Sequence, residues 1–201
     1  MMTDIEMHEK WVAEGGRERL TAYDHLTSKS IVWEIGGWLG EWAQQMSKKY
    51  DPWITVFEPV NLWYDKLVAM FNHDRKIRVL NYGLSDETRI ARFGIDADAS
   101  GIACNSPRFE QVRLRSVEET FNDLRFDSVD VTQINCEGGE YKILPQLIST
   151  NLIRRFNVLA IQFHYLDASS TAQRRVIQEH LSITHRQTEC YDWKFEYWER
   201  K

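Results

Sequence analysis

The stretch VWEIGGWLGEW, residues 32–42, decides how this chain folds. Glu34 lies near the end of an apolar run, the pair Gly36 and Gly37 follows, and Gly40 comes three residues after the pair. A sharp turn from a strand into a helix needs glycine where φ is positive or where the backbone must approach a ligand. Open α/β sheets bind their ligands at such turns, at the carboxyl ends of their strands. We therefore expect a ligand site here, with the backbone at Gly36 close to the ligand.

Apolar runs similar to the one before this turn recur along the chain. They are rich in Ile, Val and Phe and are near-continuous rather than alternating, which is typical of parallel strands buried on both faces. These runs are residues 31–35, 54–58, 77–81, 129–135 and 157–164. Because amphipathic helical patterns separate them, the sequence predicts a doubly wound α/β sheet with helices on both faces.

Two segments depart from this alternation. Residues 186–201, RQTECYDWKFEYWERK, alternate aromatic and charged side chains and predict a terminal antiparallel hairpin at the sheet edge. The irregular section between the third and fourth strands holds two possible short strands and a loop at residues 96–108. Loops of that length often contact substrate, so we expect this loop to lie near the site.

The size and composition of the chain bound its class. A chain of 201 residues, 43% hydrophobic and 27% charged, is close to the usual size of one globular domain. We predict a single domain over residues 1–201. It would consist of an N-terminal helical segment (1–30), a cofactor-binding core (31–164) and a C-terminal helix with a hairpin (165–201).

Charge and cysteine content indicate the partners and the compartment. A net charge of -5 supplies no broad positive field, so we expect a small-molecule or glycan acceptor and no nucleic acid. Three cysteines without a C-x-x-C pair favour a reducing cytoplasm. No stretch approaches about 18 consecutive apolar residues, so we expect neither a membrane span nor a membrane partner.

Two cofactor classes use a glycine turn at this place. A dinucleotide fold needs G-x-G-x-x-G, and taking Gly37 and Gly40 as the last two glycines puts Ile35 where the first must be. The turn of an S-adenosylmethionine fold commonly reads acid-x-Gly-x-x-x-Gly, which Glu34, Gly36 and Gly40 satisfy. We therefore predict S-adenosyl-L-methionine as the cofactor, with Glu34 holding its amino-acid end. A nicotinamide- or nucleotide-dependent sugar-modifying enzyme is the alternative.

Glu58 is the candidate ligand for a ribose. It ends the second apolar run, and Pro59 biases it toward an extended conformation that directs its carboxylate into the crevice. A carboxylate there can accept hydrogen bonds from both ribose hydroxyls. Nicotinamide and S-adenosylmethionine folds both use such an acid, so Glu58 indicates a ribose more firmly than it indicates which cofactor. We also expect Trp38, inside the glycine turn, to contact the cofactor.

Six segments carry a family resemblance. Each is a weak signal alone, and together they span residues 31–164, which is most of the chain: VWEIGGWLGEW, VFEP, LNYGLSDETRIARFG, LRSVEETF, INCEGGEYKIL and IQFH. Their order and spacing resemble the landmarks of the FkbM family of S-adenosylmethionine-dependent methyltransferases. The segment EGGEYKIL, compared with the family's E-G-x-E, is the strongest single match.

This resemblance implies a fold, an activity and further site residues. The fold would be a Rossmann-like class I methyltransferase fold, with a mostly parallel seven-stranded sheet in the order 3-2-1-4-5-7-6, strand 7 antiparallel, and helices on both faces. The activity would be O-methylation of a hydroxyl on a sugar, a glycan or a small natural-product acceptor. Glu58 would bind the ribose, and Tyr82, Gly83 and Leu84 would line the adenine.

The chain departs from the family pattern at the end of the fourth strand. The family usually reads K-x-D-x-E-G there, whereas this chain has Gln133, Asn135 and Glu137. An aspartate could serve as a base or a metal ligand, but Asn135 can only hydrogen-bond. We therefore predict no metal site and assign Asn135 to cofactor binding or to the catalytic centre. Because Asn135 replaces that acid, a cofactor-binding protein with impaired catalysis is a further alternative.

Two residues are candidates to take the proton of the acceptor. Methyl transfer from a sulfonium is an in-line displacement, so the protein must align donor and acceptor and remove a proton from the hydroxyl. His164 has a side chain suited to base work near neutrality, or it is a strand-end histidine bonded to backbone. Glu137 could instead receive the proton, or cap the following helix through the N–H groups of Gly138 and Gly139.

Overall fold

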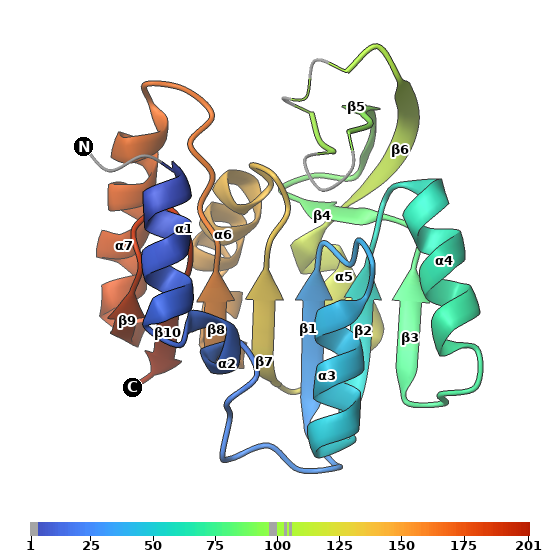
Figure 1. The fold of residues 1–201 in the computed structure, drawn as a ribbon, viewed down its shortest axis with the longest axis horizontal. Helices are drawn as coiled ribbons and strands as arrows, with labels where there is room; N and C mark the ends of the chain where they lie inside the picture. Colours follow the sequence, from blue (N-terminus) through green and yellow to red (C-terminus); the bar gives the residue numbers. More distant parts are fainter. Residues whose placement is uncertain (1–3, 97–99, 103, 105) are drawn as a thin grey trace.

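The computed structural model describes residues 4–96, 100–102, 104 and 106–201 (Figure 1). Its main sheet has seven short strands, of which the inner five are mostly buried and the edge strands β3 and β9 are more exposed. In order across the sheet they are β3 (Ile77–Leu80), β2 (Trp53–Phe57), β1 (Ile31–Ile35), β7 (Val129–Ile134), β8 (Phe156–Ile161), β10 (Glu196–Arg200) and β9 (His185–Cys190).

The strand order and directions confirm the predicted fold. Pairing is parallel from β3 through β8, and β10 runs antiparallel to both β8 and β9. Numbered along the chain, the strands of this sheet therefore have the order 3-2-1-4-5-7-6, and the C-terminal hairpin lies at the sheet edge. The largest boundary difference is at β8, which ends at Ile161, so His164 lies in the loop beyond it rather than on the strand.

Helices cover both faces of the main sheet (Figure 1). On one face, α5, α6 and α7 pack against a cluster that includes Trp33 and Phe156. On the other face, α3 and α4 cover β1 and β2, while α1 contacts β8 and β10 through Trp11. The helices are α1 (Asp4–Ala13), α2 (Gly16–Arg19), α3 (Glu41–Tyr50), α4 (Asn61–Phe71), α5 (Val117–Leu124), α6 (Glu140–Ser149), the 3-10 helix η2 (Leu152–Arg155) and α7 (Ser170–Thr184). No helix in the described part of the chain is long and apolar enough to cross a membrane.

A second, three-stranded sheet lies beyond the carboxyl ends of β1, β2 and β3 (Figure 1). Its order is β4 (Gly83–Ser85), β6 (Phe109–Ser116) and β5 (Arg89–Gly94), with β5 antiparallel and β4 parallel to β6. The sequence indicated two short strands here, and the third is β4. Within the predicted loop 96–108, residues 97–99, 103 and 105 lie outside the described residues.

The two ends of the chain pack on each other. The ring of Trp11 on α1 stacks on Phe195 in the hairpin, with ring centroids 5.9 Å apart. Arg19 of α2 forms an ion pair of 2.5 Å with Glu189 of β9, and its guanidinium lies 4.3 Å from the ring centroid of Tyr197 on β10. These contacts hold the N-terminal helices against the last strands of the sheet.

Candidate active site

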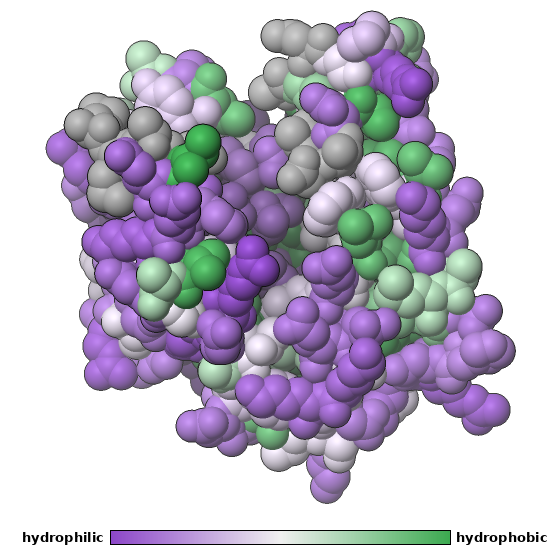
Figure 2. All heavy atoms as spheres, in the orientation of Figure 1, coloured by the Kyte–Doolittle hydropathy of each residue, from purple (hydrophilic) through white to green (hydrophobic). Residues whose placement is uncertain are grey.

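A cleft opens at the carboxyl ends of the parallel strands, where Figure 2 shows a hollow in the surface. Its volume is about 1940 Å³, and segments distant in the sequence line it. Every site residue predicted from the sequence lines this cleft except Tyr82: Glu34, Gly36, Gly37, Trp38, Gly40, Glu58, Gly83, Leu84, Asn135, Glu137 and His164. Tyr82 instead packs with its ring centroid 5.8 Å from that of Phe57.

The glycine turn after β1 is shaped by its protein neighbours. Gly36 has φ +94°, and a Cβ there would lie 1.9 Å from the backbone carbonyl oxygen of Asn135. A Cβ on Gly37 would lie 2.4 Å from Cγ1 of Val56. We expected Gly36 to bring the backbone close to a ligand, but its lack of a side chain is required by the neighbouring strand end. The turn is thus held tightly between β7 and β2.

Glu58 ties the end of β2 to this turn. Its carboxylate is 4% exposed and accepts backbone N–H bonds from Trp38 at 2.9 Å and from Val60 at 2.8 Å. Burial raises the pKa of Glu58 to about 6, although these N–H groups oppose the rise. A carboxylate offers about four lone-pair sites, and the backbone N–H of Gly37 also acts on Glu58, so about one site remains for a further donor. The hydrogen bond from the Trp38 N–H to Glu58 holds Trp38 at φ +41°, and the indole is partly exposed in the cleft.

Three buried side-chain oxygens in the cleft have no hydrogen-bond partner among the described residues. They are Oε2 of Glu34, Oε1 of Gln133 and Oδ1 of Asn135. Glu34 and Gln133 are paired in register on β1 and β7, so their side chains lie on the same face of the sheet. Burial raises the pKa of Glu34 well above its usual value, and the charge of Glu58 raises it further. A ligand that brings N–H donors or positive charge to this point would satisfy these oxygens.

His164 lies between two carboxylates that come from the loop after β7 and from α6. Its Nδ1 is 3.0 Å from Oε1 of Glu140, and its Nε2 is 2.9 Å from Oε1 of Glu137. Burial lowers the pKa of His164, but the two carboxylates raise it more, to about 9. We expected a base with an ordinary pKa. A pKa of about 9 keeps the imidazole protonated near neutral pH, where it cannot accept a proton.

Glu140 was not among the residues singled out from the sequence. It is the first residue of α6 and is fully buried, and its Oε2 accepts the backbone N–H of Gly138 at 3.0 Å. That bond also contradicts the capping alternative for Glu137, because the Gly138 N–H donates to Glu140 and the Gly139 N–H donates to the carbonyl oxygen of Cys136. The only sequence signal for Glu140 was the second acid of the segment EGGE.

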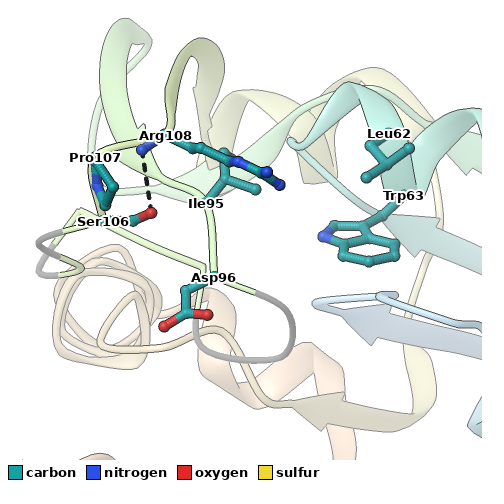
Figure 3. Close-up of a pocket in the computed structure, with 7 residues that line it drawn as sticks. All are labelled: Leu62, Trp63, Ile95, Asp96, Ser106, Pro107 and Arg108. Atoms are coloured by element: carbon teal, nitrogen blue, oxygen red, sulfur yellow. Dashed lines mark hydrogen bonds between the residues drawn. The ribbon is translucent and has the colours of Figure 1, made fainter.

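A smaller pocket of about 380 Å³ adjoins the cleft between the start of α4 and the ends of the β5–β6 loop (Figure 3). Trp63 lines both spaces, and within the described residues its indole N–H has no hydrogen-bond partner. The indole nitrogen and the guanidinium of Arg108 face each other in Figure 3. The lining residues are Leu62, Trp63, Ile95, Asp96, Ser106, Pro107 and Arg108. The pocket thus combines an aromatic wall with one acid and one base.

No family model and no curated protein matches this sequence. Solved structures match it over most of its length. An rRNA methylase from Streptococcus thermophilus is 10% identical with a TM-score of 0.52, and the match covers 100% of this chain and 98% of that one. Fibrillarin of Methanococcus jannaschii, a pre-rRNA processing protein, is 9% identical with a TM-score of 0.54, covering 89% and 70%. Fibrillarin of Aeropyrum pernix, with natively bound S-adenosyl-L-methionine, is 11% identical with a TM-score of 0.50, covering 94% and 74%.

At these identities the likeness shows the fold. The chain has the Rossmann-like fold of class I S-adenosylmethionine-dependent methyltransferases, as the strand order and the position of the cleft already indicated.

The expectation that excluded nucleic acid as a partner is wrong. Two of the structures that share this fold belong to proteins named for rRNA methylation and pre-rRNA processing. The exclusion rested on the net charge of -5, which is a sum over the whole chain. Binding of a polyanion depends on the local distribution of charge around a site, so a negative total does not exclude it.

Proposed function

We propose that this protein is an S-adenosylmethionine-dependent methyltransferase that methylates a hydroxyl on a sugar ring. One observation carries the proposal: in a methyltransferase fold, the cleft at the ends of β1, β2 and β7 gathers Glu58 with the unpartnered buried oxygens of Glu34 and Asn135. The bound cofactor would supply a methyl group activated on a sulfonium. Fibrillarin of Aeropyrum pernix, which has this fold and holds that cofactor, supports the choice.

The residues present fit this cofactor. Glu58 retains acceptor capacity for a ribose hydroxyl. The free oxygens of Glu34 and Gln133 suit the ammonium group of the amino-acid end, because they need donors and lie in register on adjacent strands. Gly83 and Leu84 line the cleft and would contact the adenine. A bound ammonium would also favour the ionised form of Glu34, whose pKa is raised by burial.

Glu137 is the residue that would take the proton of the acceptor hydroxyl. Its side chain is 28% exposed and lines the cleft, whereas His164 is protonated near neutral pH. Glu137 has φ +49° and precedes Gly138 at φ +101°, a sharp turn that Asn135 and Cys136 separate from the end of β7. A carboxylate at this position can accept the proton as the hydroxyl oxygen attacks the methyl carbon in line.

Two observations support a sugar as the acceptor. The pocket beside the cleft offers the indole of Trp63 for the apolar face of a sugar ring, and Asp96 and Arg108 for its hydroxyls. The resemblance of residues 31–164 to the FkbM family also supports a hydroxyl acceptor. The names of the structural neighbours favour a second candidate acceptor, an RNA.

The proposal is tested first on the cofactor and then on the acceptor. S-adenosylhomocysteine at about 100 times its dissociation constant should add about 2.7 kcal/mol of stability, which a thermal shift detects. NADH should give no shift, and a shift with NADH alone would reject the methyltransferase proposal. Transfer of a labelled methyl group to a panel of oligosaccharides and RNA transcripts then identifies the acceptor. Label on RNA alone would replace the glycan reading with the RNA candidate.

We also propose a cytoplasmic location. The three cysteines are free thiols, and none is paired in the structure. This state supports the reducing compartment expected from their number and spacing.

A further inference from the structure

We propose that Glu140 is a positioning residue: it fixes the His164 ring so that the ring orients the Glu137 carboxylate toward the acceptor. This inference rests on the proposed function, because it assigns Glu140 a part in the same methyl transfer. Glu140 is fully buried and does not line the cleft, so it acts through His164 rather than on the substrate.

Each oxygen of the Glu140 carboxylate has two contacts. Oε1 accepts the backbone N–H of His164 at 2.8 Å and faces its Nδ1 at 3.0 Å. Oε2 accepts the backbone N–H of Gly138 at 3.0 Å and faces the thiol of Cys136 at 3.7 Å. The loops that follow β7 and β8 therefore converge on one buried carboxylate. A side chain with this many partners is held in one orientation, and it restricts the orientation of the groups that contact it.

The consequence for His164 is a fixed ring. The contact at Nδ1 fixes the ring, and the opposite nitrogen, Nε2, then lies 2.9 Å from Oε1 of Glu137, which is an ion-pair distance without the alignment of a hydrogen bond. The hydroxyl of Tyr141 donates to the carbonyl oxygen of His164 at 2.8 Å and pins the main chain. Both nitrogens of the protonated ring carry hydrogen, so Glu140 acts by fixing the plane of the ring and thereby the position of Nε2 beside Glu137.

Charge around His164 favours the protonated ring. Glu137 and Glu140 are the two acids that face it. The thiol of Cys136 and the hydroxyl of Tyr141 are the other titratable groups of this cluster, and burial raises the pKa of both. The positive charge of Arg174 on α7 opposes the rise in the pKa of Tyr141. The negative charges of both acids stabilise the protonated imidazole. Replacing Glu140 alone should therefore lower the pKa of His164 toward its ordinary value.

The first arm of the test needs no acceptor. An NMR titration of the imidazole resonances, assigned with His164→Asn, should show a pKa of about 9 for His164. In Glu140→Gln this pKa should fall by at least one unit, and in the matched control Glu179→Gln, an exposed acid on α7, it should not change. An unchanged His164 titration in folded Glu140→Gln overturns the inference.

The second arm measures catalysis. Misplacement of a reacting group by about 1 Å can cost roughly a hundredfold in rate, so kcat of Glu140→Gln should fall at least tenfold while cofactor affinity stays unchanged. Glu140→Asp should recover part of kcat. Unchanged kcat in Glu140→Gln, or equal loss of kcat and cofactor affinity, contradicts a positioning role.

Two controls separate the possible failures. If Glu140→Gln does not fold, His164→Gln interrupts the same series of contacts, Glu140 to His164 to Glu137, at its middle residue. It must give the same loss of kcat without loss of cofactor affinity. Full kcat in His164→Gln overturns the inference. If the wild-type protein binds no cofactor, the proposed function fails, and the NMR arm still decides whether Glu140 fixes the His164 ring.

Discussion

Gly36 and Gly15 form a matched pair of residues with left-handed backbones. Gly36 has φ +94° and a Cβ there would lie 1.9 Å from a backbone oxygen, whereas Gly15 has φ +79° and its nearest neighbour would be 3.9 Å away. Gly15→Ala should cost about 1–2 kcal/mol from the backbone conformation alone. Gly36→Ala should cost roughly 1–3 kcal/mol more, because the strand end must move. Urea unfolding measures both, and equal costs would show that the strand end yields freely.

His164 should make the stability of the protein depend on pH. Its pKa is raised from 6.5 to about 9 in the folded protein, so the stabilisation is full below pH 6.5 and is lost as the pH rises through 9. That loss is on the order of 3 kcal/mol. Chemical unfolding from pH 6 to 10 should show a steeper fall for the wild type than for His164→Gln. Parallel curves for the two proteins would contradict the raised pKa. The control is His180→Gln, which changes an exposed histidine of α7.

The sequence predicted the position of Glu34 and Glu58, next to the glycine turn, better than that of Glu140, which contacts His164. Glu34 and Glu58 end apolar runs that neighbour each other in the sheet, so local pattern was sufficient to bring them together. Glu140 depends on a loop 24 residues further along the chain, and no local pattern shows that its carboxylate is buried there. Burial by a distant loop also explains why His164 was expected to have an ordinary pKa.

At the scale of elements, the N-terminal helices depend on Arg19. Its guanidinium pairs with Glu189 at 2.5 Å and lies over the ring of Tyr197, and the side chain is 19% exposed. Arg19→Ala should lower the free energy of unfolding by about 2 kcal/mol and increase hydrogen exchange in α1. Arg186→Ala is the control, because Arg186 pairs with Glu199 on the same hairpin with its side chain 72% exposed. Its effect should stay within about 0.5 kcal/mol, and equal effects would contradict the docking role.

The elements differ in how far the sequence predicts them. The parallel strands were found within three residues at their ends because both faces are buried and the apolar runs are continuous. Strand β4 escaped notice, since it has only three residues and pairs with β6 some thirty residues later. The end of β8 was placed too late because the apolar run continues through Phe163, whereas the strand ends at Ile161 and only the N–H of Gln162 still donates to Ile134 of β7.

At the scale of the whole molecule, the alternation of strands and helices predicted a doubly wound sheet and the family resemblance implied its strand order, but total charge was not enough to predict the partner. Alternating strands and helices admit few connections, and the observed sheet is one of them. Net charge averages over 201 residues, whereas an acceptor meets only the rim of the cleft. The cleft itself is a property of the whole molecule, since α1, the small sheet and the loops after β7 and β8 all line it.

The central claim is that this cleft binds S-adenosylmethionine through Glu58, and calorimetric titration with S-adenosylhomocysteine tests it most directly. The wild type should bind, and Glu58→Gln should bind at least tenfold more weakly, because charge-assisted bonds are worth roughly 1.5–3 kcal/mol each. Without ligand, the variant should also have a lower melting temperature, since the Glu58 carboxylate accepts hydrogen bonds from the backbone N–H groups of Trp38 and Val60. Asp65→Asn, which changes an exposed acid on α4, should bind like the wild type. No binding to the wild type, or equal affinity in Glu58→Gln, would contradict the account.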